Sequence, residues 1–124
     1  MIFGVGIDLI EVRRIEKLLK NDDLQLQKIF TEHEIDYCRK LANGSQHFAG
    51  RFAAKEAFLK ALGKGWREEI KFRDIETINN ELGKPEIILY GKTKSIFEAE
   101  ALKCSHVSIS HLKDYATAIV LIEK

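Results

Sequence analysis

Residues 51–63 carry the sequence Arg-Phe-Ala-Ala-Lys-Glu-Ala-Phe-Leu-Lys-Ala-Leu-Gly, which predicts a helix that is apolar on nearly every side. At about 100° per residue, Lys55 falls in the middle of a stripe of Phe and Leu side chains. Glu56 and Lys60 stack one turn apart along the edge of that stripe. Such a helix is normally buried, and a buried charge is costly unless it is paired or bound to an ion. We therefore expect charged groups, from the protein or from a ligand, to meet this helix.

The segments around this helix indicate a single α+β domain over residues 1–124, with a mainly antiparallel sheet packed with three to four helices. A capping box formed by Thr31 and Glu34 marks the start of a helix that we expect to end at Asn43-Gly44. The other predicted helices are 11–20, 46–62 and 93–103. The predicted strands are 2–10, 75–79, 86–90, 106–110 and 116–122.

The composition argues against several classes of protein. Twenty basic and nineteen acidic side chains give a formal net charge of +1, which argues against a dedicated nucleic-acid binder because such domains are usually strongly basic. The N-terminal apolar run is interrupted by Asp8 and is too short to span a membrane. Cys38 and Cys104 are the only cysteines, and their separation predicts free thiols rather than a disulfide framework. We expect a cytoplasmic protein that binds neither nucleic acid nor a membrane.

A pair of carboxylates is the first candidate site. One face of the predicted strand 2–10 carries four apolar side chains, and the other carries two glycines that leave open space beside Asp8. Magnesium is commonly held by one or two carboxylates, so Asp8 and Glu56 could bind it together. Alternatively, Asp8 caps the following helix and Glu56 pairs with Lys60.

Basic side chains are the second candidate. Arg51, Lys55 and Lys60 could hold a diphosphate and neutralise the charge that develops in a phosphoryl transfer. Alternatively, their aliphatic stems cover apolar surface while their charged ends reach water. His111, at the end of a predicted strand, is either a phosphate contact or a simple turn histidine.

The predicted first helix carries a basic stripe opposite its apolar face. Arg13, Lys17 and Lys20 lie within about 60° of arc, with Arg14 beside them. Such a stripe is either simply solvated or docks an acidic partner by electrostatic steering.

Five segments together resemble the holo-acyl-carrier-protein synthases, the small class of 4′-phosphopantetheinyl transferases. The similar segments occur in the family's order and extend over nearly the whole chain: GVGIDLIEVRRI at 4–15, FTEHEIDYC at 30–38, FAGRFAAKEAFLKALG at 48–63, ELGKP at 81–85 and HVSISH at 106–111. The combination of the first and third segments is the most specific part of the resemblance.

The resemblance implies roles for individual residues. Asp8 and Glu56 correspond to magnesium ligands, and Lys60 to an active-site lysine near the coenzyme A diphosphate; these three are the implied catalytic residues. Further contacts to coenzyme A are assigned to Arg51, Gly63, Lys64 and His111. The basic helix that receives the acidic carrier protein corresponds to Arg13, Arg14 and Lys17. Family members are homotrimers with active sites at subunit interfaces, which would also explain how so small a domain buries its apolar helix.

The activity that the resemblance implies is a magnesium-dependent step of fatty acid biosynthesis. It moves 4′-phosphopantetheine from coenzyme A to a serine of apo acyl carrier protein and releases adenosine 3′,5′-bisphosphate. The base that takes the serine proton is either Glu56 or a magnesium-bound water that Asp8 orients. Two other classes of function stay open at this point: a non-catalytic module that binds acidic proteins through the first helix, and an RNA-binding α+β domain. The latter would lack the aromatic platforms usual on such sheets.

Overall fold

The computed structural model describes residues 1–21, 23–64 and 69–124 and confirms the predicted α+β class. The helices in this part of the chain are α1 (Val12–Asn21), α2 (Asp23–Ile29), α3 (Glu32–Arg39), α4 (Gly44–Leu62) and α5 (Gly91–Ala99), with a short 3-10 helix η2 (Phe72–Asp74). The strands are β1 (Ile2–Glu11), β2 (Ile75–Asn79), β3 (Pro85–Leu89), β4 (Cys104–His111) and β5 (Tyr115–Glu123). None of the helices in the described ranges is both long and apolar enough to cross a bilayer.

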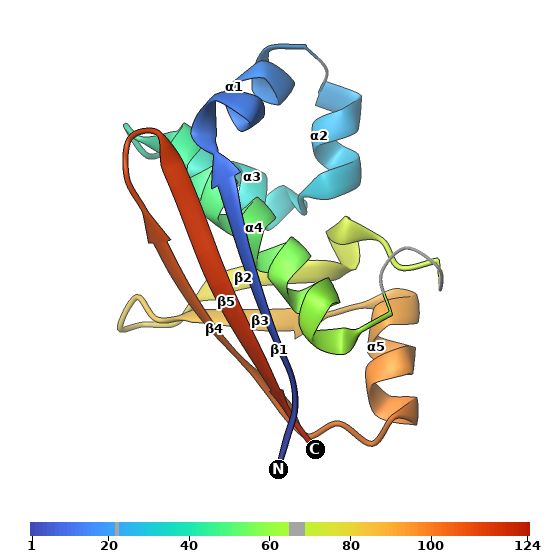
Figure 1. Cartoon of the computed structure of the whole chain (residues 1–124). Helices are drawn as coiled ribbons and strands as arrows, with labels where there is room; N and C mark the ends of the chain where they lie inside the picture. Colours follow the sequence, from blue (N-terminus) through green and yellow to red (C-terminus); the bar gives the residue numbers. More distant parts are fainter. Residues whose placement is uncertain (22, 65–68) are drawn as a thin grey trace.

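The strands form two antiparallel sheets. A three-stranded sheet has the order β1-β5-β4, and β2 pairs with β3 in a separate two-stranded sheet. Figure 1 shows α4 crossing behind the three-stranded sheet, with α1 and α2 at one end of the molecule and α5 and both chain ends at the other. In the described part of the chain, helices therefore cover only one side of the large sheet.

Helix α4 is the centre of the hydrophobic core, as its sequence predicts. Its side chains are buried on nearly every face, and it packs against β1 and β5. Phe58 has no exposed surface, and the rings of Phe30 and Phe48 meet edge to face with their centroids 5.1 Å apart. Burying one such side chain contributes about 1.5–3 kcal/mol relative to leaving it exposed.

Helix α3 ends earlier than predicted. Its capping box is confirmed, but the helix stops at Arg39 rather than at Asn43-Gly44, and Gly44 is instead the first residue of α4. The turn between the two helices is tight, because a Cβ at Gly44 would lie 2.5 Å from the carbonyl oxygen of Cys38. Gly44 therefore allows the close turn between α3 and α4 and does not mark the end of α3.

Helix α2 is absent from the sequence-based prediction. It is only seven residues long, and Leu26 is its one buried side chain among the described residues, so its sequence has no apolar stripe to detect. Contacts from a distant segment hold its C-terminal end: the Arg73 guanidinium donates to the carbonyl oxygen of Gln27 at 2.5 Å and to that of Phe30 at 3.5 Å. Tertiary contacts rather than local propensity therefore stabilise α2.

The outer side of the three-stranded sheet exposes a row of apolar side chains. The exposed fraction is 53% for Val5, 63% for Ile7 and 67% for Leu9 on β1, and β5 adds Tyr115 at 51% and Ile119 at 43%. We call these five residues the outer apolar face. A contiguous apolar patch of this kind on a small domain marks an interaction surface.

Candidate active site

Glycines in β1 bring α4 unusually close to the strand. A Cβ at Gly4 would lie 1.9 Å from the carbonyl oxygen of Ala61, and one at Gly6 would lie 1.9 Å from that of Ala57. The expectation that these glycines leave open space beside Asp8 is therefore wrong, because the helix itself fills that space. The close packing brings Asp8 to the same side of β1 as α4.

Asp8 and Lys60 form an ion pair between β1 and α4. The Lys60 Nζ lies 3.2 Å from Asp8 Oδ1 and donates to the carbonyl oxygen of Ile7 at 2.9 Å. The side chain of Asp8 is 17% exposed, whereas that of Lys60 is 56% exposed and reaches solvent. Among the described residues, Lys60 therefore forms its ion pair with Asp8. The alternative interpretation, in which Glu56 pairs with Lys60, is wrong.

Glu56 lies in the same electrostatic environment. It is half-buried, and its pKa is raised first by burial and second by the negative charge of Asp8. The positive charges of Lys60 and Arg14 oppose this rise in pKa. The structure therefore brings Asp8, Glu56 and Lys60 within interaction range, and we refer to them as the carboxylate cluster.

The basic stripe of α1 borders the carboxylate cluster. Arg13, Arg14 and Lys17 are all exposed, and Arg14 is close enough to act on the pKa of Glu56. A negatively charged molecule that binds this stripe would therefore lie next to the carboxylate cluster.

The C-terminal end of α4 follows the sequence-based expectation. Gly63 adopts the left-handed conformation, with φ of 76°, and its N–H donates to the carbonyl oxygen of Leu59 at 2.9 Å. Lys64 forms an ion pair of 3.1 Å with Glu100, and both side chains are about one-third exposed. The rest of the Gly63-Lys64-Gly65 segment lies outside the described residues.

Arg51 lies elsewhere on α4 and lines a small pocket with Asn79 and His111. It is buried, its guanidinium lies 4.4 Å from the centroid of the Tyr37 ring, and it donates to Asn79 Oδ1 at 3.2 Å. Its buried Nε has no hydrogen-bond partner among the described residues. A buried guanidinium with an unused donor is suited to an anionic ligand.

Histidines complete this second site, which we call the Arg51–His111 pocket. His111 Nδ1 lies 2.8 Å from Gln46 Oε1, and the His111 and His47 rings meet edge to face with centroids 4.7 Å apart. The pKa of His47 is lowered by burial and by the positive charges of His111 and Arg51. The lowered pKa favours the neutral form of His47, whereas Arg51 supplies a permanent positive charge to this pocket. Tyr37, Gln46 and Asn79, which contact Arg51 or His111, come from α3, α4 and β2. They are not among the site residues that the sequence predicts.

The two sites occupy opposite sides of α4. Arg51 and Lys60 are nine residues apart, about two and a half turns of an α-helix, so their side chains leave the helix in opposite directions. Lys60 contacts β1, whereas Arg51 contacts β2. Within one chain, the carboxylate cluster and the Arg51–His111 pocket are therefore separate.

Lys55 belongs to neither site. It has no exposed surface, forms an ion pair of 2.8 Å with Glu34, and donates to the carbonyl oxygens of Phe72 at 3.0 Å and Ile75 at 2.5 Å. All three of its N–H donors are thereby used inside the protein. Both sequence-based interpretations of Lys55, as a phosphate ligand or as a stem whose charge reaches water, are wrong.

Comparison of the sequence with those of known proteins finds similar proteins over its whole length. Residues 4–120 match the model of the 4′-phosphopantetheinyl transferase superfamily. The chain is 46% identical over 125 residues to a holo-[acyl-carrier-protein] synthase of Geobacter metallireducens, covering 100% of this chain and 99% of the relative. It is also 46% identical over 124 residues to one of Syntrophus aciditrophicus, covering 99% of this chain and 97% of the relative.

Solved structures agree with the sequence comparisons. The fold matches that of the Neisseria meningitidis holo-[acyl-carrier-protein] synthase with a TM-score of 0.90 at 34% identity, covering 100% of both chains. The Bacillus anthracis synthase, solved in complex with CoA (3′,5′-ADP), matches with a TM-score of 0.81 at 41% identity, covering 100% of this chain and 98% of that one. The Helicobacter pylori synthase in complex with coenzyme A matches with a TM-score of 0.83 at 32% identity, covering 96% and 99%.

Proposed function

Because this chain belongs to the 4′-phosphopantetheinyl transferase superfamily, we propose that it transfers 4′-phosphopantetheine from coenzyme A to a serine of apo acyl carrier protein. The products are the holo carrier and adenosine 3′,5′-bisphosphate. The observation that carries this proposal is the full-length likeness to synthases, including two that were solved with coenzyme A or its 3′,5′-ADP part.

We further propose that Asp8 and Glu56 hold a magnesium ion. Carboxylate oxygens are the donors that Mg²⁺ prefers. The pKa of Glu56 is raised partly by the charge of Asp8, so a divalent cation held by both carboxylates would relieve a repulsion between them. When bound, the ion would supply charge neutralisation to the diphosphate of coenzyme A.

Lys60 is suited to hold the phosphate of the leaving group. Its contacts with Ile7 and Asp8 use two of its three N–H donors within the described structure, and its side chain is exposed. The remaining N–H can therefore bind a phosphate oxygen and stabilise the negative charge that develops during transfer. We propose that Gly63 and Lys64, which follow at the end of the same helix, contact the same diphosphate.

The Arg51–His111 pocket would bind another part of coenzyme A. The unused Nε of Arg51 and the nearby imidazole of His111 suit a phosphate group. Since this pocket and the carboxylate cluster lie on opposite sides of α4, one coenzyme A molecule would contact both only if they came from two copies of the chain.

A homotrimer with active sites between subunits satisfies this requirement. The outer apolar face, which includes Ile7 and Ile119, offers the surface on which the copies would meet. Burial of this face would remove the apolar side chains of β1 from water and would complete each site with residues of a second chain.

The basic stripe of α1 would dock the carrier protein. Arg13, Arg14 and Lys17 are exposed beside the carboxylate cluster, so an acidic carrier bound there would present its serine to the reaction. The enzyme would act in the cytoplasm, in fatty acid biosynthesis, and the free thiols of Cys38 and Cys104 are consistent with a reducing compartment.

Mass spectrometry of an apo carrier protein tests the proposed reaction directly. The carrier is incubated with coenzyme A and this protein, with and without Mg²⁺. We expect the carrier to gain the mass of one phosphopantetheine group only when the metal is present. An unmodified carrier in the presence of Mg²⁺ would contradict the proposed transfer, and full modification after chelation would contradict the role of the metal.

A further inference from the structure

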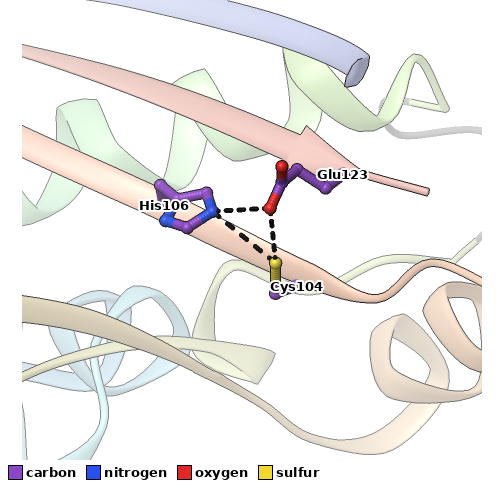
Figure 2. A group of neighbouring side chains, drawn as sticks. All are labelled: Cys104, His106 and Glu123. Atoms are coloured by element: carbon purple, nitrogen blue, oxygen red, sulfur yellow. Dashed lines mark hydrogen bonds and ion pairs between the residues drawn. The ribbon is translucent and has the colours of Figure 1, made fainter. Parts of the chain in front are cut away.

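Three side chains with metal-binding atoms meet on the outer side of the three-stranded sheet, at the end of the molecule where the chain termini lie. They are Cys104 and His106 of β4 and Glu123 of β5 (Figure 2). Cys104 and His106 point to the same side because they alternate along one strand. The register of the hairpin places Cys104 directly opposite Glu123. The backbone of two paired strands thus holds all three side chains together.

The ligand atoms of these side chains are close to one another. Cys104 Sγ lies 3.0 Å from Glu123 Oε2 and 3.6 Å from His106 Nε2, and His106 Nε2 lies 3.0 Å from the same carboxylate oxygen. His106 is exposed, and the other two side chains are half-buried. The three atoms therefore form a small triangle that is open to solvent on one side.

This triangle has nearly the size that a zinc ion requires. With Zn–S of about 2.3 Å and Zn–N and Zn–O of about 2.0–2.1 Å, tetrahedral ligand atoms stand about 3.3–3.6 Å apart. The observed separations of 3.0–3.6 Å differ from these values by no more than a small side-chain rotation. We propose that Cys104, His106 and Glu123 form a second metal site, which binds Zn²⁺ with water as the fourth ligand.

The chemistry of the donors separates this site from the carboxylate cluster. A thiolate and an imidazole select a soft or borderline ion such as Zn²⁺, whereas Asp8 and Glu56 offer only the hard oxygen donors that suit Mg²⁺. Only three protein side chains supply ligands and the site is open to solvent, so we expect weaker binding than in a closed structural zinc site. All three ligands come from one chain, so the site needs no residue of a second copy. It lies on the same side of the sheet as the outer apolar face, at the end near the chain termini.

Titration of the purified protein with Zn²⁺, in excess Mg²⁺ to occupy the carboxylate cluster, measures the stoichiometry and affinity. We expect one Zn²⁺ per chain, and at least tenfold weaker binding in each of the variants Cys104→Ser, His106→Gln and Glu123→Gln, since even outer partners of metal sites change affinity by 10- to 100-fold. Co²⁺ in place of Zn²⁺ should give a thiolate-to-cobalt charge-transfer absorption that is absent from Cys104→Ser.

Two histidine controls distinguish this site from zinc binding elsewhere on the protein. His33→Gln, on the exposed side of α3, should bind Zn²⁺ like the parent protein. His111→Gln should do the same, although its ring pairs with that of His47. Loss of binding in His111→Gln with unchanged binding in Cys104→Ser would overturn the proposal. Absence of Zn²⁺ binding by the parent protein would also overturn it and would leave these residues as a hydrogen-bonded group only.

Discussion

Lys55 and Glu34 form an ion pair of 2.8 Å in which neither side chain is exposed to solvent. Burial lowers the pKa of Lys55, and the carboxylate of Glu34 opposes this change. Glu34 also accepts the backbone N–H groups of Thr31 and Thr77, at 3.0 Å each. The capping box of α3 thus supplies the counter-charge that the apolar helix α4 requires, and it ties α3, α4 and β2 together.

Removing one partner of this ion pair should strongly destabilise the protein. We expect Lys55→Met to lower the free energy of unfolding by about 3–5 kcal/mol, because it leaves the carboxylate of Glu34 buried without a counter-charge. Urea denaturation followed by circular dichroism measures the change. In the double variant Lys55→Met/Glu34→Gln the loss should be smaller than the sum of the two single losses. Additive losses would show that the two residues do not act as a pair.

Glu56→Gln should abolish turnover and leave the fold intact. The substitution keeps the shape of the half-buried side chain but removes the charge that we propose for magnesium binding. We expect the rate to fall at least about 100-fold, the lower end of the contribution of a positioned acid–base group. Holo-carrier formation measured by mass spectrometry gives the rate, and Glu16→Gln, on the exposed side of α1, is the matched control. Near-normal turnover by Glu56→Gln would refute the assignment.

Lys17→Glu should weaken the interaction with the carrier protein and not that with coenzyme A. Reversing one exposed charge costs about 1 kcal/mol, so we expect the KM for the carrier to rise about fivefold. The salt dependence of kcat/KM should also change. Lys94→Glu, at the far end of the molecule on α5 (Figure 1), makes the same charge change away from α1. Equal effects of Lys17→Glu on both substrates would rule out α1 as the docking surface.

Ile7→Asp should disrupt the proposed trimer. Ile7 is already 63% exposed in the single chain, so the substitution should cost little in folding but should place a charge in the subunit interface. Sedimentation velocity should show monomers in place of trimers, and activity should be lost with them. Leu82→Asp makes the same substitution at a residue that is 95% exposed and lies outside the outer apolar face. A trimer that survives Ile7→Asp would place the interface elsewhere.

Mixed trimers should recover activity from two inactive variants. Glu56→Gln damages the carboxylate cluster, and Arg51→Met damages the Arg51–His111 pocket while keeping the packing of the arginine stem. If each active site combines the two groups from different chains, subunit exchange between the variants creates some intact sites. We expect activity to appear on mixing in a coupled assay for adenosine 3′,5′-bisphosphate. Mixed trimers without activity would show that each site is built from one chain.

Part of the candidate site could be predicted from local patterns. The apolar pattern around Lys55 predicts that α4 is buried, and the Thr31/Glu34 pair predicts a capping box that the structure confirms. The end of α4 at Gly63 is confirmed as well. These features depend on residues within one or two helical turns of one another, so their spacing in the sequence carries the information.

The partners of these residues could not be predicted in the same way. From the sequence alone, the glycines of β1 suggest open space beside Asp8. In the fold, they instead allow Ala57 and Ala61 to pack against the strand. Cys104 lies outside the strand predicted over residues 106–110, so its alternation with His106 along β4 appears only in the structure. Glu123 joins them only through the register of β4 and β5.

By itself, the sequence determined that a helix rich in alanine and phenylalanine lies at the centre of an α+β domain and carries charges that require partners. Only the tertiary structure decided that Glu34 meets Lys55, that Asp8 meets Lys60, and that Arg51 lies on the opposite side of the helix. Local spacing determines which side of a helix or strand a residue occupies. Contacts between residues distant in the sequence depend on strand register and helix packing, which the whole chain sets together.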